Sequence, residues 1–360
     1  MIGKTPKKHQ MSIFDVALES FIDMNHELVL LSKQIDLEEV ESEFAEYYCA
    51  DNGRPSVPIR KMVGMMLLKS IYNLSDEGVV ARWLENPYMQ YFTGEKVFQK
   101  RPPMNPIDMT KFRKRIGEKD AEKLFKISLM VNAGEITEKE MRMVMVDSTV
   151  QEKNITFPTD AKVYSFHEPE VQCISKGKEH KKYEFGSKSA IGKTGSGLIV
   201  SALAFKGNPY DGHTLSAHWE QIRRLTGHTP KEILTDRGYR GKKSVGNTEI
   251  SIPASGSPNQ SYYQRRKARK KFCKRAGIEP VIGHLKSDHR MMRNYLKGTL
   301  GDTINTLMAA AAYNMRHWMN KNALSSFGSW LLALVGRLEN AIFGNNNKSA
   351  CRCPALAVVA

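Results

Sequence analysis

The sequence predicts an α/β domain preceded by an all-α N-terminal region, and three observations support this fold class. Before residue 134, apolar residues recur at helical spacing in several long segments. From Met141 onward, short apolar runs that are typical of buried strands take their place, beginning with Met141–Val146. A helical segment, Thr214–Leu225, then separates two groups of these runs. Strands that alternate with helices along a chain predict a sheet covered by helices.

The composition is that of a globular protein with a polyanionic partner. Of its 360 residues, 41% are hydrophobic and 26% are charged, which suits a chain of two or three domains. The net charge of +16 and the pI of about 9.5 favour nucleic acid as the partner, with an anionic membrane surface as the alternative. The cysteines are scattered and odd in number, so we expect a reducing cytosol and no disulfide framework.

Nothing in the sequence predicts insertion into a membrane. The first ten residues lack an apolar signal core. The longest apolar run, Trp330–Val335, is too short to cross a bilayer. We therefore expect a cytoplasmic protein with no membrane partner.

The segment Ile59–Glu85 is the clearest candidate for DNA recognition in the helical region. It contains two predicted helices joined by the turn Asn73–Ser75, and Ser75 can cap the second helix. This pattern fits a helix-turn-helix DNA reader, and the alternative is an ordinary helical hairpin with methionines in its core. Its basic residues are Arg60, Lys61, Lys69 and Arg82. The region's other expected elements are helices over Ser12–Gln34 and Thr110–Gly134, the latter with a basic start, and a linker over Thr93–Pro106.

Three acidic residues stand where they can form a metal site. Asp147 ends the strand predicted over Met141–Val146, Asp236 follows the apolar pair Ile233–Leu234, and Glu279 opens a late helical region. Carboxylates at strand ends and on a nearby helix can meet at one edge of a sheet, and three of them suit Mg²⁺ or Mn²⁺. Two such ions can assist both the attacking and the leaving oxygen of a phosphoryl displacement. The other expected elements are strands over Gly197–Phe205 and Glu249–Ile252, a loop or edge strand over Lys162–Gln172, and an amphipathic helix over Asp302–Trp318.

The segment Tyr262–Arg275 is intensely basic and precedes Glu279. It contains Arg265, Arg266 and Lys271, interleaved with aromatic residues. We interpret it as a contact for a nucleic-acid backbone. The alternative is a solvated charged face or a disordered arm.

Several blocks of the chain have the form of motifs from one family. They are Val146-Asp-Ser-Thr149, Asn208-Pro-Tyr-Asp-Gly-His213, Leu234-Thr-Asp-Arg-Gly-Tyr-Arg-Gly241, and Ile278-Glu-Pro-Val-Ile-Gly-His-Leu-Lys286 followed by Asp288-His-Arg290. Together they resemble the DDE transposases of bacterial insertion sequences, in the IS-five superfamily. Ile59–Glu85 is similar to the helical N-terminal domain of this group, so the resemblance covers most of the chain.

The resemblance extends to a Tyr-Arg-Glu-Lys pattern around the glutamate. Arg275 lies four residues before Glu279 and Lys286 lies seven residues after it, as the family pattern requires. The tyrosine position holds Phe272, which keeps a ring for stacking on a base but lacks the hydroxyl. Pro280 fits only the first turn of a helix, so either a helix begins near Pro280 or a longer one is kinked there.

The resemblance implies an RNase H-like, retroviral-integrase-like fold with a mixed sheet. Glu279 comes 43 residues after Asp236, which leaves no room for the large insertion found in many relatives. The implied site is Asp147, Asp236 and Glu279, which hold two Mg²⁺ or Mn²⁺ ions. The implied phosphate or DNA ligands are Arg275, Lys286, Arg237, Tyr239, Phe272, Lys271, Arg265 and Arg266.

The implied activity is metal-dependent cleavage of DNA at the ends of an insertion sequence and strand transfer into target DNA. The partners are then double-stranded DNA, both the terminal inverted repeats and the target, and a second copy of the chain. The location is the bacterial cytoplasm, on the nucleoid when bound to DNA. The expected domains are residues 1–134 for DNA binding, 135–320 for catalysis and 321–360 as a helical or flexible tail. A structure-selective nuclease without strand transfer, and a basic DNA-binding protein with an inactive site, are the alternatives.

Other polar residues have more ordinary interpretations. Asp160 and Asp211 lie in turn-like sequence and are expected to act in turns, with replacement of Asp147 by either as the alternative. His284 and His289 are expected to orient neighbours or contact DNA, because hard cations prefer oxygen ligands. A phosphate-binding loop ending at Gly192-Lys-Thr194 would require glycine at position 187, which is Ser187.

Overall fold

The computed structural model describes Gly3 and residues 16–49, 52–53, 55–155, 168–175, 183–253 and 261–343, without the side chains of Glu38 and of residues 324–343. The chain divides into two compact units, Met1–Trp318 and Met319–Ala360. All contacts discussed below lie within the first unit. Among the described residues, no helix is long and apolar enough to cross a bilayer.

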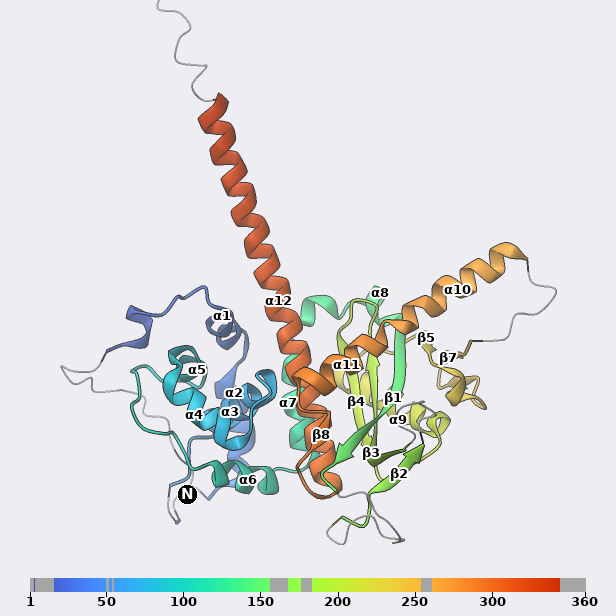
Figure 1. Ribbon diagram of the computed structural model, residues 1–360, viewed down its shortest axis with the longest axis horizontal. Helices are drawn as coiled ribbons and strands as arrows, with labels where there is room; N and C mark the ends of the chain where they lie inside the picture. The colour runs from blue at the N-terminus through green and yellow to red at the C-terminus, as the bar shows by residue number, and fades with distance from the viewer. Residues whose placement is uncertain are drawn as a thin grey trace, which may run out of the picture. The chain divides into compact units, whose positions relative to one another are not determined.

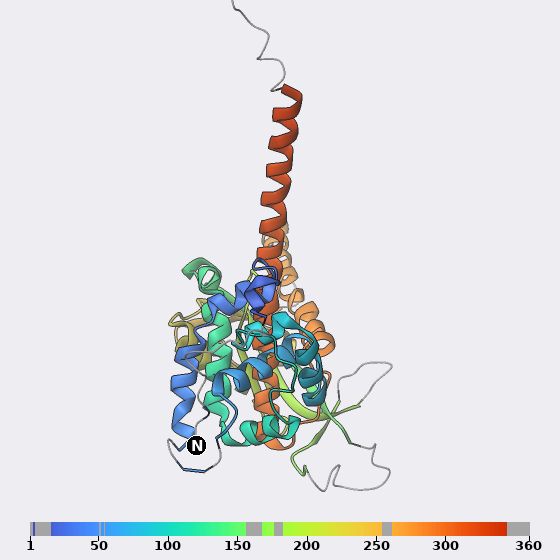
Figure 2. The ribbon, with the colours of Figure 1, turned by 90° about the vertical axis from the view of Figure 1, so that its left-hand side faces the viewer.

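The region before the sheet is helical, as the sequence predicts. Its elements are η1 Leu18–Ser20, α1 Glu27–Gln34, α2 Leu37–Phe44, η2 Ala45–Tyr47, α3 Ile59–Ile71, α4 Asp76–Glu85, α5 Pro87–Phe92, α6 Pro106–Arg115, α7 Glu118–Val131, η3 Ala133–Glu135 and α8 Glu138–Met141. The hairpin of α3 and α4 is present, and the Ser75 hydroxyl accepts a hydrogen bond from the Gly78 amide at 2.9 Å. These helices (blue to teal) lie beside the sheet in Figure 1 and in front of it in Figure 2.

Two of the predicted helices are shorter than expected, because one begins late at a capping residue and the other is divided at a glycine. Residues 12–15 of the Ser12–Gln34 prediction lie outside the described residues, and α1 begins only at Glu27, where His26 Nδ1 accepts the Leu28 amide. The Thr110–Gly134 helix is divided at Gly117 into α6 and α7. Asn105, with Pro106 in the first turn, starts α6 within the expected linker.

The sheet is mixed, in the strand order β2-β3-β1-β5-β7-β6, with β4 paired to β3 and β8 paired to β1. β1 is antiparallel to β3 and parallel to both β5 and β8. The strands are β1 Met143–Lys153, β2 Gln172–Ser175, β3 Tyr183–Lys193, β4 Ile199–Phe205, β5 Glu232–Leu234, β6 Ser244–Val245, β7 Thr248–Ser251 and β8 Arg293–Asn294. Residues 162–167 of the predicted loop or edge strand lie outside the described residues.

Two features of the sheet correct the sequence analysis. β1 does not end at Val146 but continues to Lys153, because β3 pairs with it beyond Asp147. β3 itself was not predicted, since its sequence, YEFGSKSAIGK, lacks a long apolar run. Its alternating small residues allow close pairing: a Cβ added to Gly186 would lie 2.0 Å from the Gln151 carbonyl oxygen.

Four helices after β4 complete the fold. They are α9 Asp211–Thr226, which packs against β4, α10 Tyr262–Ala276, α11 Ile278–Asp288 and α12 Gly298–Phe343; a short helix, η4 Arg237–Tyr239, follows β5. Gly227 ends α9 with φ +72°, as expected for a helix-terminating glycine. Gly277 separates α10 from α11, so Pro280 lies in the first turn of α11, the first of the two predicted alternatives. In Figure 1, α10 (gold) extends from α11 past β5 and away from the sheet.

Candidate active site

The register of the central strands brings Asp147 and Asp236 to the same level of the sheet. In the parallel pair of β1 and β5, Met145 lies opposite Leu234. Asp147 is two residues beyond Met145, and Asp236 is two residues beyond Leu234, so both side chains point to the same face. β5 ends at Leu234, which leaves the edge of β1 beside Asp147 open. Asp147 is therefore at the end of a strand pairing, although it is not at the end of its strand.

A hydrophobic cluster on that face positions the helix that carries Glu279. Met145, Leu234 and Ile278 are buried together. Met143, Phe272 and Ile282 pack against them. Ile278 is the first residue of α11, so its burial holds the start of this helix against β1 and β5. Glu279 is the next residue and remains exposed at the same edge.

One guanidinium group brings the three acidic residues together. Arg275 Nη2 lies 2.9 Å from Asp147 Oδ2 and 3.8 Å from Asp236 Oδ2, and Arg275 Nη1 lies 3.7 Å from Glu279 Oε1. The Arg275 and Asp147 side chains are 17% and 14% exposed, whereas that of Glu279 is 66% exposed. Side-chain exposure therefore increases across the site, from Asp147 on the buried strand β1 to Glu279, which faces solvent. Asp147, Asp236 and Glu279 converge as the sequence predicts, but on Arg275.

The carboxylates suit a divalent ion by their chemistry, and they already surround a cation. Three oxygen donors on one sheet edge are the donor set that Mg²⁺ or Mn²⁺ prefers. In the described part of the chain, however, no three acidic, histidine or cysteine residues are grouped closely enough to hold a metal ion. Arg275 lies between the carboxylates instead, so a metal site requires this side chain to move.

Asp211 and Tyr239 form a second layer of the site. A Cβ added to Gly238 would lie 3.0 Å from Asp236 Oδ1 and 3.2 Å from Asp211 Oδ2, so the two acids are close neighbours. Burial, and then the charges of Asp211, Asp147 and Asp236, raise the pKa of Tyr239 well above its ordinary value. Asp211 therefore belongs to the acidic cluster, as well as starting α9.

One lysine of β3 pairs with an acid of the cluster and a second lies beside Gly277 at the start of α11, and neither was among the predicted site residues. Lys188 Nζ is 2.7 Å from Asp211 Oδ1. Lys193 lies opposite Met145, and its amine would be 3.3 Å from a Cβ added to Gly277. Burial lowers the pKa of Lys193. Recognising β3 as the antiparallel partner of β1 would have been the signal for both.

The predicted DNA ligands occupy different environments. Arg237, Arg265 and Arg266 are exposed, and Lys286 is half-buried two turns after Glu279 on α11. Lys271 forms an ion pair with Glu232 and donates a hydrogen bond to Ser251 Oγ at 2.9 Å. Phe272 packs in the hydrophobic cluster, and Tyr239 is 0% exposed. In this structure the Tyr239 side chain is buried beneath the site, and Phe272 is partly buried against the hydrophobic cluster.

The basic residues of the α3–α4 hairpin are largely engaged within the protein. Lys61 pairs with Glu95, and Lys69 Nζ lies 2.6 Å from Asp76 Oδ1. The Arg82 guanidinium lies 5.4 Å from the centre of the Tyr72 ring. These contacts favour the helical-hairpin interpretation over groove reading by α4.

The remaining polar candidates have structural partners. His284 Nδ1 is 2.7 Å from Asp288 Oδ2, and His289 Nδ1 is 3.0 Å from the Ser70 carbonyl oxygen. Gly192-Lys-Thr194 is the end of β3 followed by a turn. Asp160 lies outside the described residues.

A mixed sheet flanked by helices, with acidic side chains from β1, the end of β5 and the start of α11 at one edge, is the arrangement of an RNase H-like fold. A model of a transposase domain (DUF772) matches residues 16–115, and a model of the transposase DDE domain matches residues 140–315. The chain belongs to the DDE transposases of insertion sequences, enzymes that cleave DNA and transfer its strands. Enzymes of this family use divalent metal ions.

Individual relatives are less informative about the family than these two domain matches. The chain is 38% identical over 161 residues to "Uncharacterized protein ORF8 in nfe locus" from Rhizobium meliloti, an alignment that covers 44% of this chain and 77% of that protein. Two solved structures of the Mos1 transposase, titled as a strand transfer complex and a pre-cleavage transpososome, are 11% and 9% identical with TM-scores of 0.20. They span 71% and 84% of this chain and 82% and 98% of theirs. Similarity at this level adds nothing to the assignment.

Proposed function

We propose that Asp147, Asp236 and Glu279 form the catalytic site with which this transposase cuts DNA at the ends of its element and joins them to target DNA. The observation that supports this most directly is their convergence, from β1, the end of β5 and the start of α11, within 3.8 Å of the same guanidinium. Residues that are distant in sequence and meet around one cation form a site built to hold positive charge.

The three carboxylates would hold Mg²⁺ or Mn²⁺, two ions in the complete complex. Bound there, the ions would supply Lewis-acid stabilisation of the oxygens at the reacting phosphorus. Arg275 balances the acids in the free protein and turns to the phosphodiester when DNA arrives, because arginine binds phosphate in the same two-pronged way as carboxylate. Lys286 and Arg237 contact the flanking phosphates.

Buried Tyr239 keeps the acids in place from below. Its ring fills the space under Asp211 and Asp236, and its hydroxyl stays neutral because burial raises its pKa. A neutral, buried ring can hold the neighbouring carboxylates in position without neutralising their negative charge. Tyr239 is therefore a positioning residue in this proposal.

The rest of the chain would deliver DNA to this site. Residues 1–134 would bind the terminal inverted repeats, 135–320 would carry the chemistry and 321–360 would form the tail. Arg265 and Arg266 are exposed on α10, of which no residue is buried, and we propose that they contact a DNA backbone. Because two element ends must be joined, we propose a dimer as the active form, acting on the nucleoid in the bacterial cytoplasm.

The test is an assay on labelled DNA that carries the ends of the element, with Mg²⁺, Mn²⁺ or Ca²⁺. We expect the wild type to give both cut and joined products with Mg²⁺ or Mn²⁺. Asp236→Asn should lose both by more than about a thousandfold, since a residue of a catalytic unit is replaced. Glu249→Gln removes an exposed carboxylate from the neighbouring strand β7 and should change neither.

The products distinguish the alternatives. Cut DNA without joined DNA would indicate a nuclease, and binding without either would indicate an inactive site. Full cleavage by Asp236→Asn would overturn the site assignment.

A further inference from the structure

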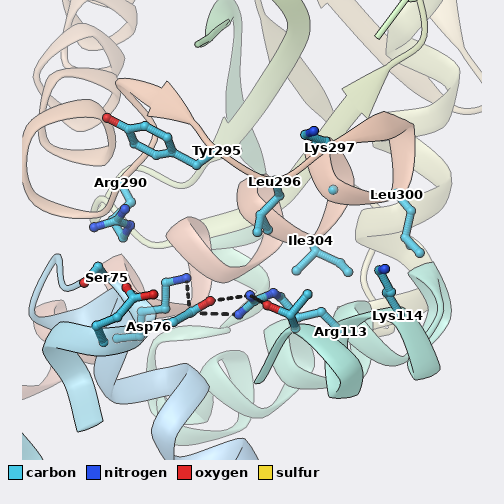
Figure 3. Close-up of a pocket in the computed structure, with 14 residues that line it drawn as sticks. Ser75, Asp76, Arg113, Lys114, Arg290, Tyr295, Leu296, Lys297, Leu300 and Ile304 are labelled. Carbon is cyan, nitrogen blue, oxygen red and sulfur yellow. Dashed lines mark hydrogen bonds and ion pairs between the residues drawn. The ribbon is translucent and has the colours of Figure 1, made fainter. Parts of the chain in front are cut away.

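A cavity of about 740 Å³ lies between the helical region and the start of α12, and its lining is separate from the acidic site. Its walls come from the ends of α3 and α6, the start of α4 and the segment that follows α11 (Figure 3). It is the size of small-molecule sites in proteins. The proposed catalytic roles do not involve any residue that lines it.

The cavity is lined by more positive than negative side chains. Arg113 donates to both oxygens of Asp76, at 3.0 and 2.5 Å, while Lys69 shares the same carboxylate. Burial and the charge of Arg113 lower the pKa of Lys69 to about 8, although Asp76 opposes this. One carboxylate thus serves two buried cations. The charged residues that line the cavity are Lys69, Arg113, Lys114, Arg290 and Lys297 against Asp76 and Glu77.

Two of these cations have no partner among the described residues. No hydrogen bond or ion pair involves the amines of Lys114 or Lys297 within the described ranges, and both side chains are exposed. Arg290 has φ +63°, a left-handed conformation that is unusual outside glycine and that tends to occur at functional sites. Its guanidinium lies 5.8 Å from the centre of the Tyr295 ring. An anion in the cavity would give these cationic side chains a partner of opposite charge.

The opposite wall, which also carries Lys297, is mostly apolar. Leu296, Leu300 and Ile304 face Arg113 and Lys114 across the cavity in Figure 3. Leu300 is 37% exposed and Tyr295 is 59% exposed, so large apolar groups border the opening. A ligand that satisfies both walls has an anionic end and a flat or apolar body. Inorganic phosphate satisfies only the first wall.

We infer that this cavity binds a nucleoside phosphate, with the phosphate on the Arg113–Lys114 wall and the nucleoside on the Leu296–Leu300 wall. This inference rests on the proposed function, which brings a DNA strand to the protein. The ligand is an unpaired nucleotide of that strand, because pairing and stacking in a duplex would cover the faces of its base.

The position of the cavity suits a strand held in the acidic site. α11 carries Glu279 at its start and spans about 14 Å to Asp288, which is roughly four nucleotide steps along DNA. At its far end, the Asn73 side chain donates to the Ser287 carbonyl at 2.8 Å, which ties α11 to the α3–α4 turn beside the cavity. Glu279 is thus near the start of α11, and Arg290, which lines the cavity, follows two residues after its end.

Binding of deoxythymidine monophosphate, thymidine and inorganic phosphate to the full chain tests the chemistry by calorimetry. We expect the nucleotide to bind at least tenfold more tightly than either part. Lys114→Gln should weaken nucleotide and phosphate binding by about tenfold, the loss of one charge-assisted contact. Leu300→Gln should weaken nucleotide binding about fivefold and leave phosphate binding unchanged. Lys119→Gln, an exposed lysine outside the cavity, is the matched control.

The source of the nucleotide is tested with DNA in Ca²⁺. A duplex with a three-nucleotide overhang should compete with the mononucleotide and bind the wild type more tightly than a blunt duplex, and Leu300→Gln should reduce this preference about fivefold. Equal affinity for both duplexes, or competition by neither, would overturn the inference. Cutting and joining are assayed separately, so a wild type that joins DNA without this preference keeps the proposed function and loses only the cavity's role.

Discussion

Helices α10 and α11 are consecutive in the chain but are held in opposite ways. α11 buries Ile278, Val281 and Leu285 and is tied to other elements at both ends. α10 has no buried residue, and only its last turns touch the sheet, through Lys271, Phe272 and Arg275. We propose that the two helices divide the work: α11 would fix the geometry of the acidic site, and α10 would offer charge to a partner.

Glu279 should have the largest effect of any residue on these helices. Glu279→Gln is expected to reduce cleavage and joining by more than about a thousandfold, because a carboxylate of the catalytic unit is lost. Stability should change by less than about 0.5 kcal/mol, since the side chain is 66% exposed. Assays on labelled element ends and urea unfolding measure the two effects.

His284→Gln is the matched control on the same helix. His284 is exposed and pairs only with Asp288 in the structure, so activity should persist. Similar losses in the two variants would mean that α11 as a whole, and not Glu279, had been disturbed.

The anchor at the far end of α11 should matter next. His289→Ala removes a buried hydrogen bond to the Ser70 carbonyl, in the last turn of α3 where carbonyls lack helical partners, and should cost about 2 kcal/mol. His289→Asn keeps a donor and should cost less. Urea unfolding at pH 7.5 measures both; equal stability of all three proteins would show that this end of α11 is not anchored.

The same residue should make stability depend on pH. Burial lowers the pKa of His289 in the folded protein, so the unfolded chain binds the proton more readily. Its contribution is then present above the unfolded pKa of about 6.5 and is lost as pH falls below it. The wild type should lose more stability than His289→Asn between pH 7.5 and 5.5; identical losses would contradict this.

The sequence placed Asp147 in the acidic triad because it predicted that β1 ends there. β1 continues instead, but the position of Asp147 is still at an edge. β5 is only three residues long, so Asp147 borders open space even though its own strand continues. Lys193 was not found, because β3 lacks the apolar pattern of a strand. Tyr239 in Arg-Gly-Tyr-Arg was expected at the surface, because nothing local shows that its ring fills the core. The ion pair of Asp76 with Arg113 joins two helices and depends on tertiary packing.

Arg275, the last residue but one of α10, should control access of metal ions to the acids. Its guanidinium must leave the carboxylates before an ion can bind, so Arg275→Gln should bind Mn²⁺ about tenfold more tightly without DNA, the equivalent of about 1.4 kcal/mol. The rise of Tm with Mn²⁺ concentration measures this. Lys274→Gln, the exposed neighbour, is the control, and an unchanged Mn²⁺ dependence in Arg275→Gln would show that the arginine does not compete.

The smallest effect should come from the exposed part of α10. Arg265→Gln with Arg266→Gln should weaken DNA binding severalfold and reduce the slope of log K against log salt by about 0.9 for each lost phosphate contact. Cleavage at saturating DNA should be unchanged, because neither residue touches the acids. Lys119→Gln with Lys126→Gln removes the same charge from exposed positions on α7. If both double variants alter the salt dependence equally, α10 contributes only to net charge, and the division of work between the two helices fails.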